Sequence, residues 1–97
     1  MKRGSLVAPI DPKDRDAMSR DPFYKRCCLA SEKCSGRIQW HHAVTYAGRR
    51  IKDRWAILPV CEWHHDHQSA FRAQQKQIIL ARTPLQIIKQ SYPNIIL

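Results

Sequence analysis

The spacing of apolar side chains along the chain predicts two strands followed by a helix. Residues 37–42 alternate long polar and apolar side chains, as a strand with one buried face does. Residues 55–60 form a second apolar extended segment. The stretch from Glu62 to about Gln75 lacks glycine and proline and is predicted to be helical. Residues 27–36, which precede the first strand, are expected to form a loop.

A last helix is predicted near the carboxyl end. Thr83 is expected as its N-cap, Pro84 as its first helical residue, and Gln86 as the partner of Thr83 in a capping box. The helix should end before Pro93. The side chains expected to enter the core are Leu85, Ile87 and Ile88.

The first 20 residues are interpreted as an N-terminal arm, and residues 21–97 as one small domain. Glycine and proline keep the beginning of the arm irregular, and a short polar helix is expected over residues 13–19. Asp21-Pro22 should end that helix. A chain of 97 residues has little more core than a marginal fold needs, so a bound metal would help to stabilise it.

The charge of the chain indicates a phosphate-rich partner. Lysine and arginine number 17 against 8 acidic residues, a net charge of +9, which favours nucleic acid by release of counterions. A solvated basic surface and a ribosome-associated or membrane-surface peptide are the alternatives. The apolar runs are short and the first ten residues offer no signal-peptide core, so we expect no membrane partner and a cytoplasmic protein. In a reducing compartment, cysteines are better interpreted as thiolate ligands than as disulfides.

Cysteine and histidine are confined to the middle of the chain. All four cysteines and all five histidines fall between Cys27 and His67, which predicts a metal site rather than a packing core. Two adjacent His-His pairs supply too many ligands for one tetrahedral zinc. We therefore expect a closed structural zinc site and a second, open metal site.

The structural zinc site is expected to begin at Cys61 and the following helix. Cys61 and either His64 or His65 would supply two ligands, and helical geometry alone does not decide between the histidines. Cys28 and Cys34 would supply the others, although the five residues between them exceed the usual spacing. Cys27 competes with Cys28, which is preferred because it needs the smaller loop. Free buried cysteines are the structural alternative.

Residues 36–42 and 58–66 together resemble the zinc-containing HNH endonucleases, also called ββα-metal or His-Me finger nucleases. The likeness covers roughly residues 21–70 and is greatest to small phage and prophage members. It implies an α+β fold, a small zinc-stabilised ββα-metal domain with a C-terminal helical extension. The implied location is the cytoplasm of a bacterium or of a phage-infected host.

The resemblance also implies a role for each metal residue. His42 would be the general base, and His41 and His65 would hold a catalytic Mg²⁺ or Mn²⁺. The ligands of the structural Zn²⁺ would be Cys28, Cys34, Cys61 and His64.

Two positions depart from the family pattern. The only asparagine is Asn94, outside the motif, and Ala56 or its surroundings occupy the place of the central asparagine. Asp53 is the nearest polar residue that could brace that loop. Ser69 stands where some relatives have a further helix histidine, and His67 is expected to be exposed or to contact phosphate.

The expected function is metal-dependent hydrolysis of phosphodiester bonds in duplex or branched DNA. A neutral imidazole can take the proton of an attacking water, and a divalent cation can neutralise phosphate charge. A zinc-stabilised nucleic-acid-binding module without activity, and an RNA-directed nuclease, are the alternatives. A monomer and a homodimer both remain open.

The three tryptophans are expected to pack a small core around the zinc. The residues expected to contact DNA phosphates are Arg49, Arg50, Lys52, Arg54, Arg72 and Lys76.

Overall fold

The computed structural model describes residues 10–97, an α+β fold with two small antiparallel sheets. Strand β1 (Ile38–His42) pairs with β4 (Ile57–Cys61), and the register places His42 opposite Ile57. Both predicted strands are thus present. Helix α2 (Glu62–Asp66) follows β4 directly. The beginning of the predicted arm, residues 1–9, lies outside the described residues.

A second sheet, which the sequence did not predict, lies between β1 and β4 along the chain. Strands β2 (Thr45–Tyr46) and β3 (Arg49–Arg50) form a short hairpin. Its turn residues Ala47 and Gly48 both have positive φ, at 54° and 79°. Two consecutive left-handed residues make the two-residue turn whose twist matches that of paired strands. The turn therefore reverses the direction of the chain within two residues. Ala47 has a left-handed backbone conformation there, which is strained for a residue with a Cβ.

The segment after β4 forms three elements instead of the one predicted helix. Helix α2 ends at Asp66 with His67 as its C-cap, a 3₁₀ turn spans Gln68–Phe71, and α3 runs over Arg72–Arg82. The His67 ring nitrogen Nδ1 lies 2.7 Å from the Trp63 carbonyl oxygen, and the His67 backbone N–H donates to the same oxygen. A side chain that binds a nearby backbone carbonyl competes with continued helix, so His67 ends α2.

Helix α4 (Leu85–Ser91) is present and ends before Pro93, but its predicted cap and core face are wrong. Pro84 takes the N-cap position, and no side chain caps the helix. Thr83 instead ends α3, since its backbone N–H donates to the Ile79 carbonyl. Of the three predicted core residues only Ile88 is buried, at 1% exposed. Leu85 and Ile87 are 40% and 54% exposed.

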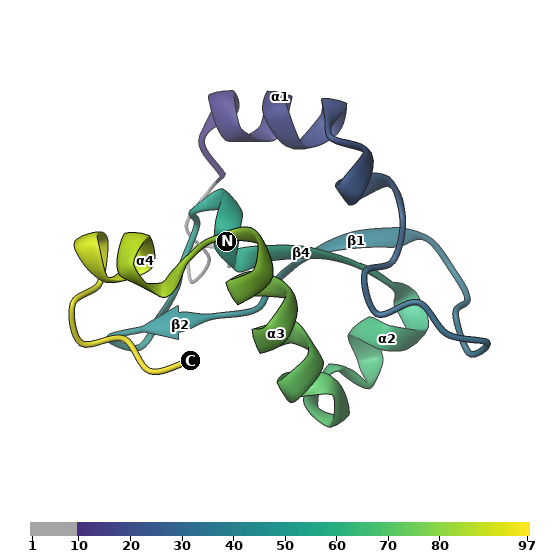
Figure 1. Ribbon diagram of the computed structural model, residues 1–97. Coiled ribbons are helices and arrows are strands. Elements are labelled where there is room, and N and C mark those ends of the chain that lie inside the picture. The colour runs from purple at the N-terminus through teal and green to yellow at the C-terminus, as the bar shows by residue number, and fades with distance from the viewer. Residues whose placement is uncertain (1–9) are drawn as a thin grey trace, which may run out of the picture.

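Helix α1 (Pro12–Arg20) agrees with the predicted polar helix and packs on the β1–β4 sheet. Asp11 caps it by accepting a hydrogen bond from the Lys13 N–H at 2.8 Å. Met18 is fully buried in a small cluster with Tyr24 and Ile57. Figure 1 shows α1 above the long pair of strands, with α3 on the other side.

Strand β4 is buried along its whole length because it is covered on both faces. Leu58 belongs to the main core cluster, which it shares with Ile79 of α3 and Ile88 of α4. Ile57 enters the cluster under α1, and Val60 enters one beside the cysteines. The tryptophans are divided among these clusters, so only Trp63 packs near the cysteines.

None of the helices within residues 10–97 combines the length and the apolar character that a membrane crossing needs.

Candidate functional site

Three cysteines and one histidine converge at the junction of β4 and α2. The ligand atoms of Cys27, Cys34, Cys61 and His64 all lie within 4.8 Å of one another. The sulfur atoms of these cysteines lie 3.5, 3.5 and 3.1 Å from His64 Nδ1. His64 is fully buried. Cys61 is also the N-cap of α2, which places His64 one turn further along the helix.

This geometry fits a bound zinc ion. A tetrahedral zinc with bonds of about 2.3 Å to sulfur and about 2.05 Å to nitrogen separates those atoms by roughly 3.6 Å. The observed distances are close to that value. One imidazole nitrogen has a single lone pair or a single proton, so it cannot hydrogen-bond three thiols at once. The four residues could therefore hold a metal such as zinc.

Ser31 contacts the histidine of this cluster from outside. Its Oγ lies 3.2 Å from His64 Nε2 and also accepts a hydrogen bond from the Lys33 N–H at 3.1 Å. A metal-ligating histidine usually donates its other ring N–H to such an oxygen, which fixes the tautomer. Ser31 thus orients His64 Nδ1 toward the cysteines. Ser31 was not among the site residues predicted from the sequence, although a serine in a short loop turn often binds nearby polar groups.

The structure places Cys27 in the cluster and corrects the preference for Cys28. The Cys28 N–H donates to the Pro59 carbonyl at 2.8 Å, which holds this segment against β4. Cys28 packs in the apolar clusters, where burial raises the pKa of its thiol to about 12. Loop length was the wrong criterion, because this backbone contact decides which cysteine faces Cys61.

The buried thiols of the cluster differ in acidity. Burial opposes ionisation of Cys61, but hydrogen bonds from His64 outweigh it and lower the pKa to about 6. Burial raises the pKa of Cys27 to about 11. A bound cation would favour the thiolate form of all three cysteines, since the thiolate is the ligand.

The second histidine group lies where β1 faces α2 and the β2–β3 hairpin. The rings of His41 and His65 meet edge to face, with centroids 5.3 Å apart. His42 diverges from its neighbour, and its Nδ1 lies 3.3 Å from the Ile51 carbonyl oxygen. The two histidines of the pair thus have different contacts, as expected of neighbours on a strand.

A cleft of about 680 Å³ opens beside His41 and His42. Three basic side chains line it, one from β3 and two from α3, and no Asp or Glu of residues 10–97 does so. These basic residues are Arg50, Arg72 and Lys76. Ile79, Ile96 and Leu97 add an apolar wall. The cleft therefore suits an anionic ligand.

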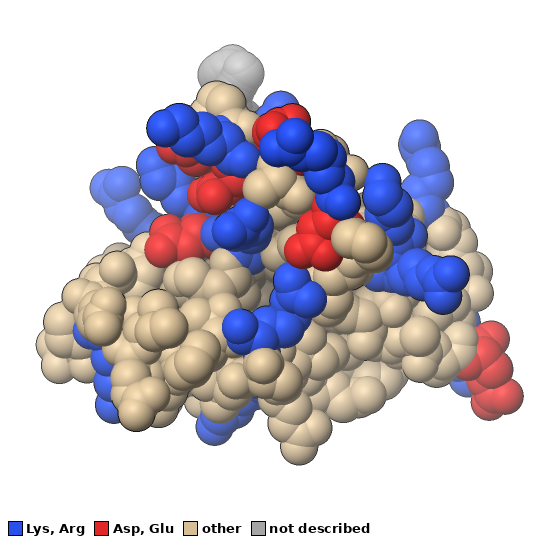
Figure 2. Space-filling model, turned by 45° about the horizontal axis from the view of Figure 1, so that its top comes forward, with Lys and Arg blue, Asp and Glu red and all other residues tan. Residues whose placement is uncertain are grey.

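The other predicted DNA contacts lie outside this cleft. Arg49 and Lys52 are exposed and are not among its lining residues. Arg54 lines a separate hollow of about 500 Å³ together with three aspartates. Figure 2 shows acidic side chains interleaved with basic ones on the α1 side of the molecule. There the charges offset one another, as in the pair between Arg82 and Asp21 at 3.1 Å.

Histidine 41 is uncharged at neutral pH. Burial is the main reason that its pKa falls to about 4, and the neighbouring charges of His65, His42 and Arg50 act in the same direction. A neutral imidazole keeps a lone pair that can bind a metal ion. His41 is therefore available as a ligand over the whole physiological range.

The loop that carries Ile51 is braced without the central asparagine of the resembled family. Asp53 accepts hydrogen bonds from the Tyr92 hydroxyl at 2.9 Å and from the Trp55 ring nitrogen at 3.3 Å. The Ile51 N–H donates to the Val44 carbonyl at 3.0 Å. These contacts hold the loop against Tyr92 at the end of α4 and against Val44, which follows β1. Asn94 is exposed beyond α4, and Ala56 is fully buried.

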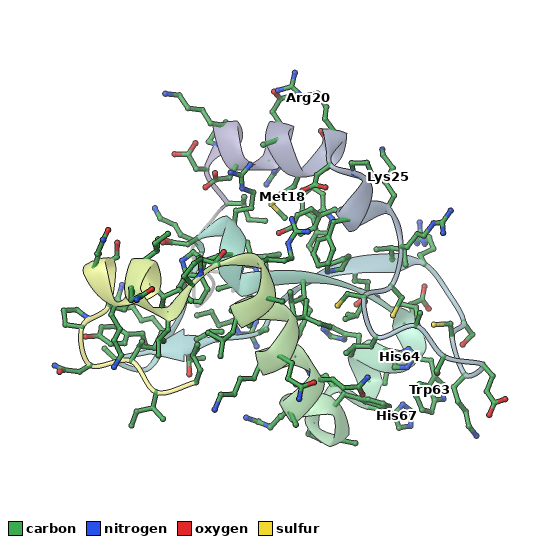
Figure 3. All side chains as sticks on the ribbon, in the orientation of Figure 1. Met18, Arg20, Lys25, Trp63, His64 and His67 are labelled. Carbon is green, nitrogen blue, oxygen red and sulfur yellow. The ribbon has the colours of Figure 1, made fainter. Side chains whose placement is uncertain are left out.

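His67 and Ser69 are exposed and do not belong to the cluster of Cys27, Cys34, Cys61 and His64. The His67 ring stacks on Trp63 with centroids 4.0 Å apart, and Trp63 in turn meets His64 at 4.9 Å. Figure 3 shows His64, Trp63 and His67 close together at this end of the molecule. His67 therefore meets the Cys27 cluster only indirectly, through Trp63.

Comparison of the chain with models of protein families, with curated proteins and with solved structures finds no match.

Proposed function

We propose that this chain is a metal-dependent endonuclease of the HNH type that hydrolyses phosphodiester bonds in DNA. The observation that carries the proposal is that His41 and His42 line one cleft in which the charged side chains, among residues 10–97, are all basic. A phosphodiester is anionic, and its hydrolysis needs a base and a means to neutralise its charge. The cleft offers both.

In this proposal His42 is the general base. The Ile51 carbonyl can only accept a hydrogen bond, so the His42 Nδ1 beside it carries the proton. Nε2 is then left with a lone pair, which can take the proton of an attacking water. The bracing of the Ile51 loop by Asp53 holds this tautomer in place.

His41 and His65 would hold the catalytic Mg²⁺ or Mn²⁺. Their rings are adjacent, and two imidazoles leave most coordination positions to water and to phosphate oxygens, as is usual for these ions. A divalent cation bound there would stabilise the charge on the phosphate and on the leaving 3′ oxygen. The products would be a 5′ phosphate and a 3′ hydroxyl.

The remaining residues bind the substrate and stabilise the fold. Arg50 from β3, and Arg72 and Lys76 from α3, would contact backbone phosphates near the scissile bond. Such contacts position DNA without reading its sequence. A structural Zn²⁺ held by the four-residue cluster would fix α2, and with it His65, against the end of β4.

A nucleic-acid-binding module without activity is the second candidate. It is favoured by the sparse ligand set, because no third histidine or acidic side chain of residues 10–97 joins His41 and His65 in a metal-binding group. Ser69 occupies the place of a further histidine. Such a module would bind DNA through the same basic side chains.

Conversion of supercoiled plasmid distinguishes the two candidates. The protein is incubated with plasmid in Mg²⁺, in Mn²⁺ or in EDTA, and the nicked and linear forms are separated on a gel. We expect nicking that requires the divalent cation. DNA binding without nicking in either cation would support the binding module instead.

A further inference from the structure

The His67 ring is exposed at the end of α2, yet it is held in a fixed orientation. It stacks on Trp63 (Figure 3), with the ring centroids 4.0 Å apart and the planes 17° apart. Its Nδ1 lies 2.7 Å from the Trp63 carbonyl oxygen, which can only accept, so Nδ1 carries the proton of this hydrogen bond. Trp63 is the only aromatic ring of residues 10–97 that packs against His67. Two contacts with one residue thus fix the position and the plane of an exposed imidazole.

The tryptophan beneath this ring is itself anchored. The Trp63 backbone N–H donates to the Ser35 carbonyl at 3.2 Å. The Trp63 ring packs edge to face against His64 and Phe71, at centroid distances of 4.9 and 6.2 Å. One face of the His67 ring is therefore covered by a well-packed side chain. Because His67 is exposed, its other face is open to a further flat ring.

The exposed ring lies next to the cleft that the proposed function assigns to DNA. Gln68, the residue after His67, is one of the residues that line the cleft. Arg72 at the start of α3 is another, and the 3₁₀ turn Gln68–Phe71 joins the two. A nucleic-acid strand whose phosphate binds Arg72 can therefore bring a neighbouring base to His67.

We infer that the open face of the His67 ring is a stacking platform for an unpaired nucleobase, so that the chain prefers DNA with a single-stranded or branched segment beside the cleft. The inference rests on the proposed function for the path of the strand. Every base has a flat π face, so stacking on an aromatic side chain tolerates any sequence. The net charge of +9 attracts the phosphates of that strand. A base inside an intact duplex is covered on both faces by its neighbours and cannot use the platform.

Two substitutions separate the flat ring from its hydrogen bond. His67→Phe keeps an aromatic plane over Trp63 and removes the bond to the carbonyl, whereas His67→Asn keeps a side-chain N–H donor and removes the plane. Ser69→Ala is the control, since Ser69 is exposed in the turn that follows. Fluorescence anisotropy measures the affinity of each zinc-loaded protein for an end-labelled oligothymidylate and for a blunt duplex of the same length, without Mg²⁺ or Mn²⁺.

His67→Asn should bind the oligothymidylate roughly 5–100-fold more weakly than the wild type, the range expected for the loss of one stacked base. His67→Phe and Ser69→Ala should bind it as the wild type does. The affinity for the duplex should be the same in all four proteins. In the wild type, the His67 ring protons should move upfield by NMR when oligothymidylate is added, because a base stacked over them exerts a ring current.

Several results would overturn the inference. His67 ring protons that do not move in the wild type would do so without any variant. Unchanged oligothymidylate affinity in a folded His67→Asn protein, or equal losses in His67→Asn and His67→Phe, would assign His67 only to the end of α2. The binding measurements do not depend on cleavage. A platform that passes these tests in a protein that nicks no plasmid would contradict the proposed nuclease and not the platform.

Discussion

Serine replacement of Cys27 or of its neighbour Cys28 should separate a metal ligand from a packing residue. Structural zinc sites of four ligands bind with roughly 10–16 kcal/mol, so an even division gives each ligand about 2.5–4 kcal/mol. That is a large part of the roughly 5–15 kcal/mol by which a domain is stable. The Cys27 sulfur lies 3.5 Å from His64 Nδ1 within the cluster, so Cys27→Ser removes such a ligand.

Cys28→Ser should be much milder. The Cys28 side chain is half-buried and packs against apolar residues, and its backbone N–H still donates to Pro59 in the variant. A hydroxyl placed there costs about 1 kcal/mol. For a chain of this size, 1 kcal/mol shifts the melting temperature by about 4–8 °C. We therefore expect a shift of that order for Cys28→Ser, and of at least about 10 °C for Cys27→Ser.

The assay combines elemental analysis with thermal unfolding followed by circular dichroism. Wild type and Cys28→Ser should carry about one zinc per chain, whereas Cys27→Ser should carry much less. Chelation of the wild type should unfold it, because zinc binding and folding are coupled. Zinc retained by Cys27→Ser but lost by Cys28→Ser would refute the reasoning from the Pro59 contact. A wild type without zinc would refute the metal site itself.

Three further predictions concern DNA, the backbone and protonation. Arg72→Ala should reduce the log-log salt dependence of DNA binding by about one unit, whereas Arg54→Ala, outside the cleft, should leave it unchanged in a salt titration. Gly36→Ala should destabilise the protein by roughly 1–3 kcal/mol in denaturant unfolding, since Gly36 has φ +83° and an added Cβ would lie 2.6 Å from Glu62. His41 should titrate near pH 4 by NMR. Because its pKa in the folded state lies below the ordinary value of 6.5, the contribution of His41 to the free energy of unfolding is fully present above pH 6.5. That contribution should be lost as the pH falls from about 6.5 to 4. An His41 that titrates near pH 6.5 would contradict its burial.

The sequence predicted the strands and helical structure whose patterns of apolar and polar residues are local and repeat along the chain. The alternation in β1, the apolar run of β4 and the glycine-free stretch after it were sufficient to place two strands and helical structure around the cysteines and histidines. The β2–β3 hairpin was missed because its strands have two residues each and its turn contains alanine rather than the expected asparagine or aspartate.

The errors concern individual side-chain and backbone contacts, both within one helix and between distant parts of the chain. The break after α2 depends on the His67 ring reaching the Trp63 carbonyl, which no periodicity reveals. The exchange of Cys28 for Cys27 depends on a hydrogen bond to Pro59, far along the chain.

The proposed function is tested most directly by the metal-dependent nicking rate of His42→Ala. If His42 is the general base, its loss should reduce the rate by roughly 10²–10⁴-fold. Zinc content, the circular dichroism spectrum and DNA affinity should stay close to wild type, since His42 lies outside the four-residue cluster. His41→Ala is the matched control on the same strand, and excess Mn²⁺ should restore part of its activity but none of that of His42→Ala. A folded, zinc-loaded His42→Ala protein that nicks plasmid at the wild-type rate would contradict the mechanism.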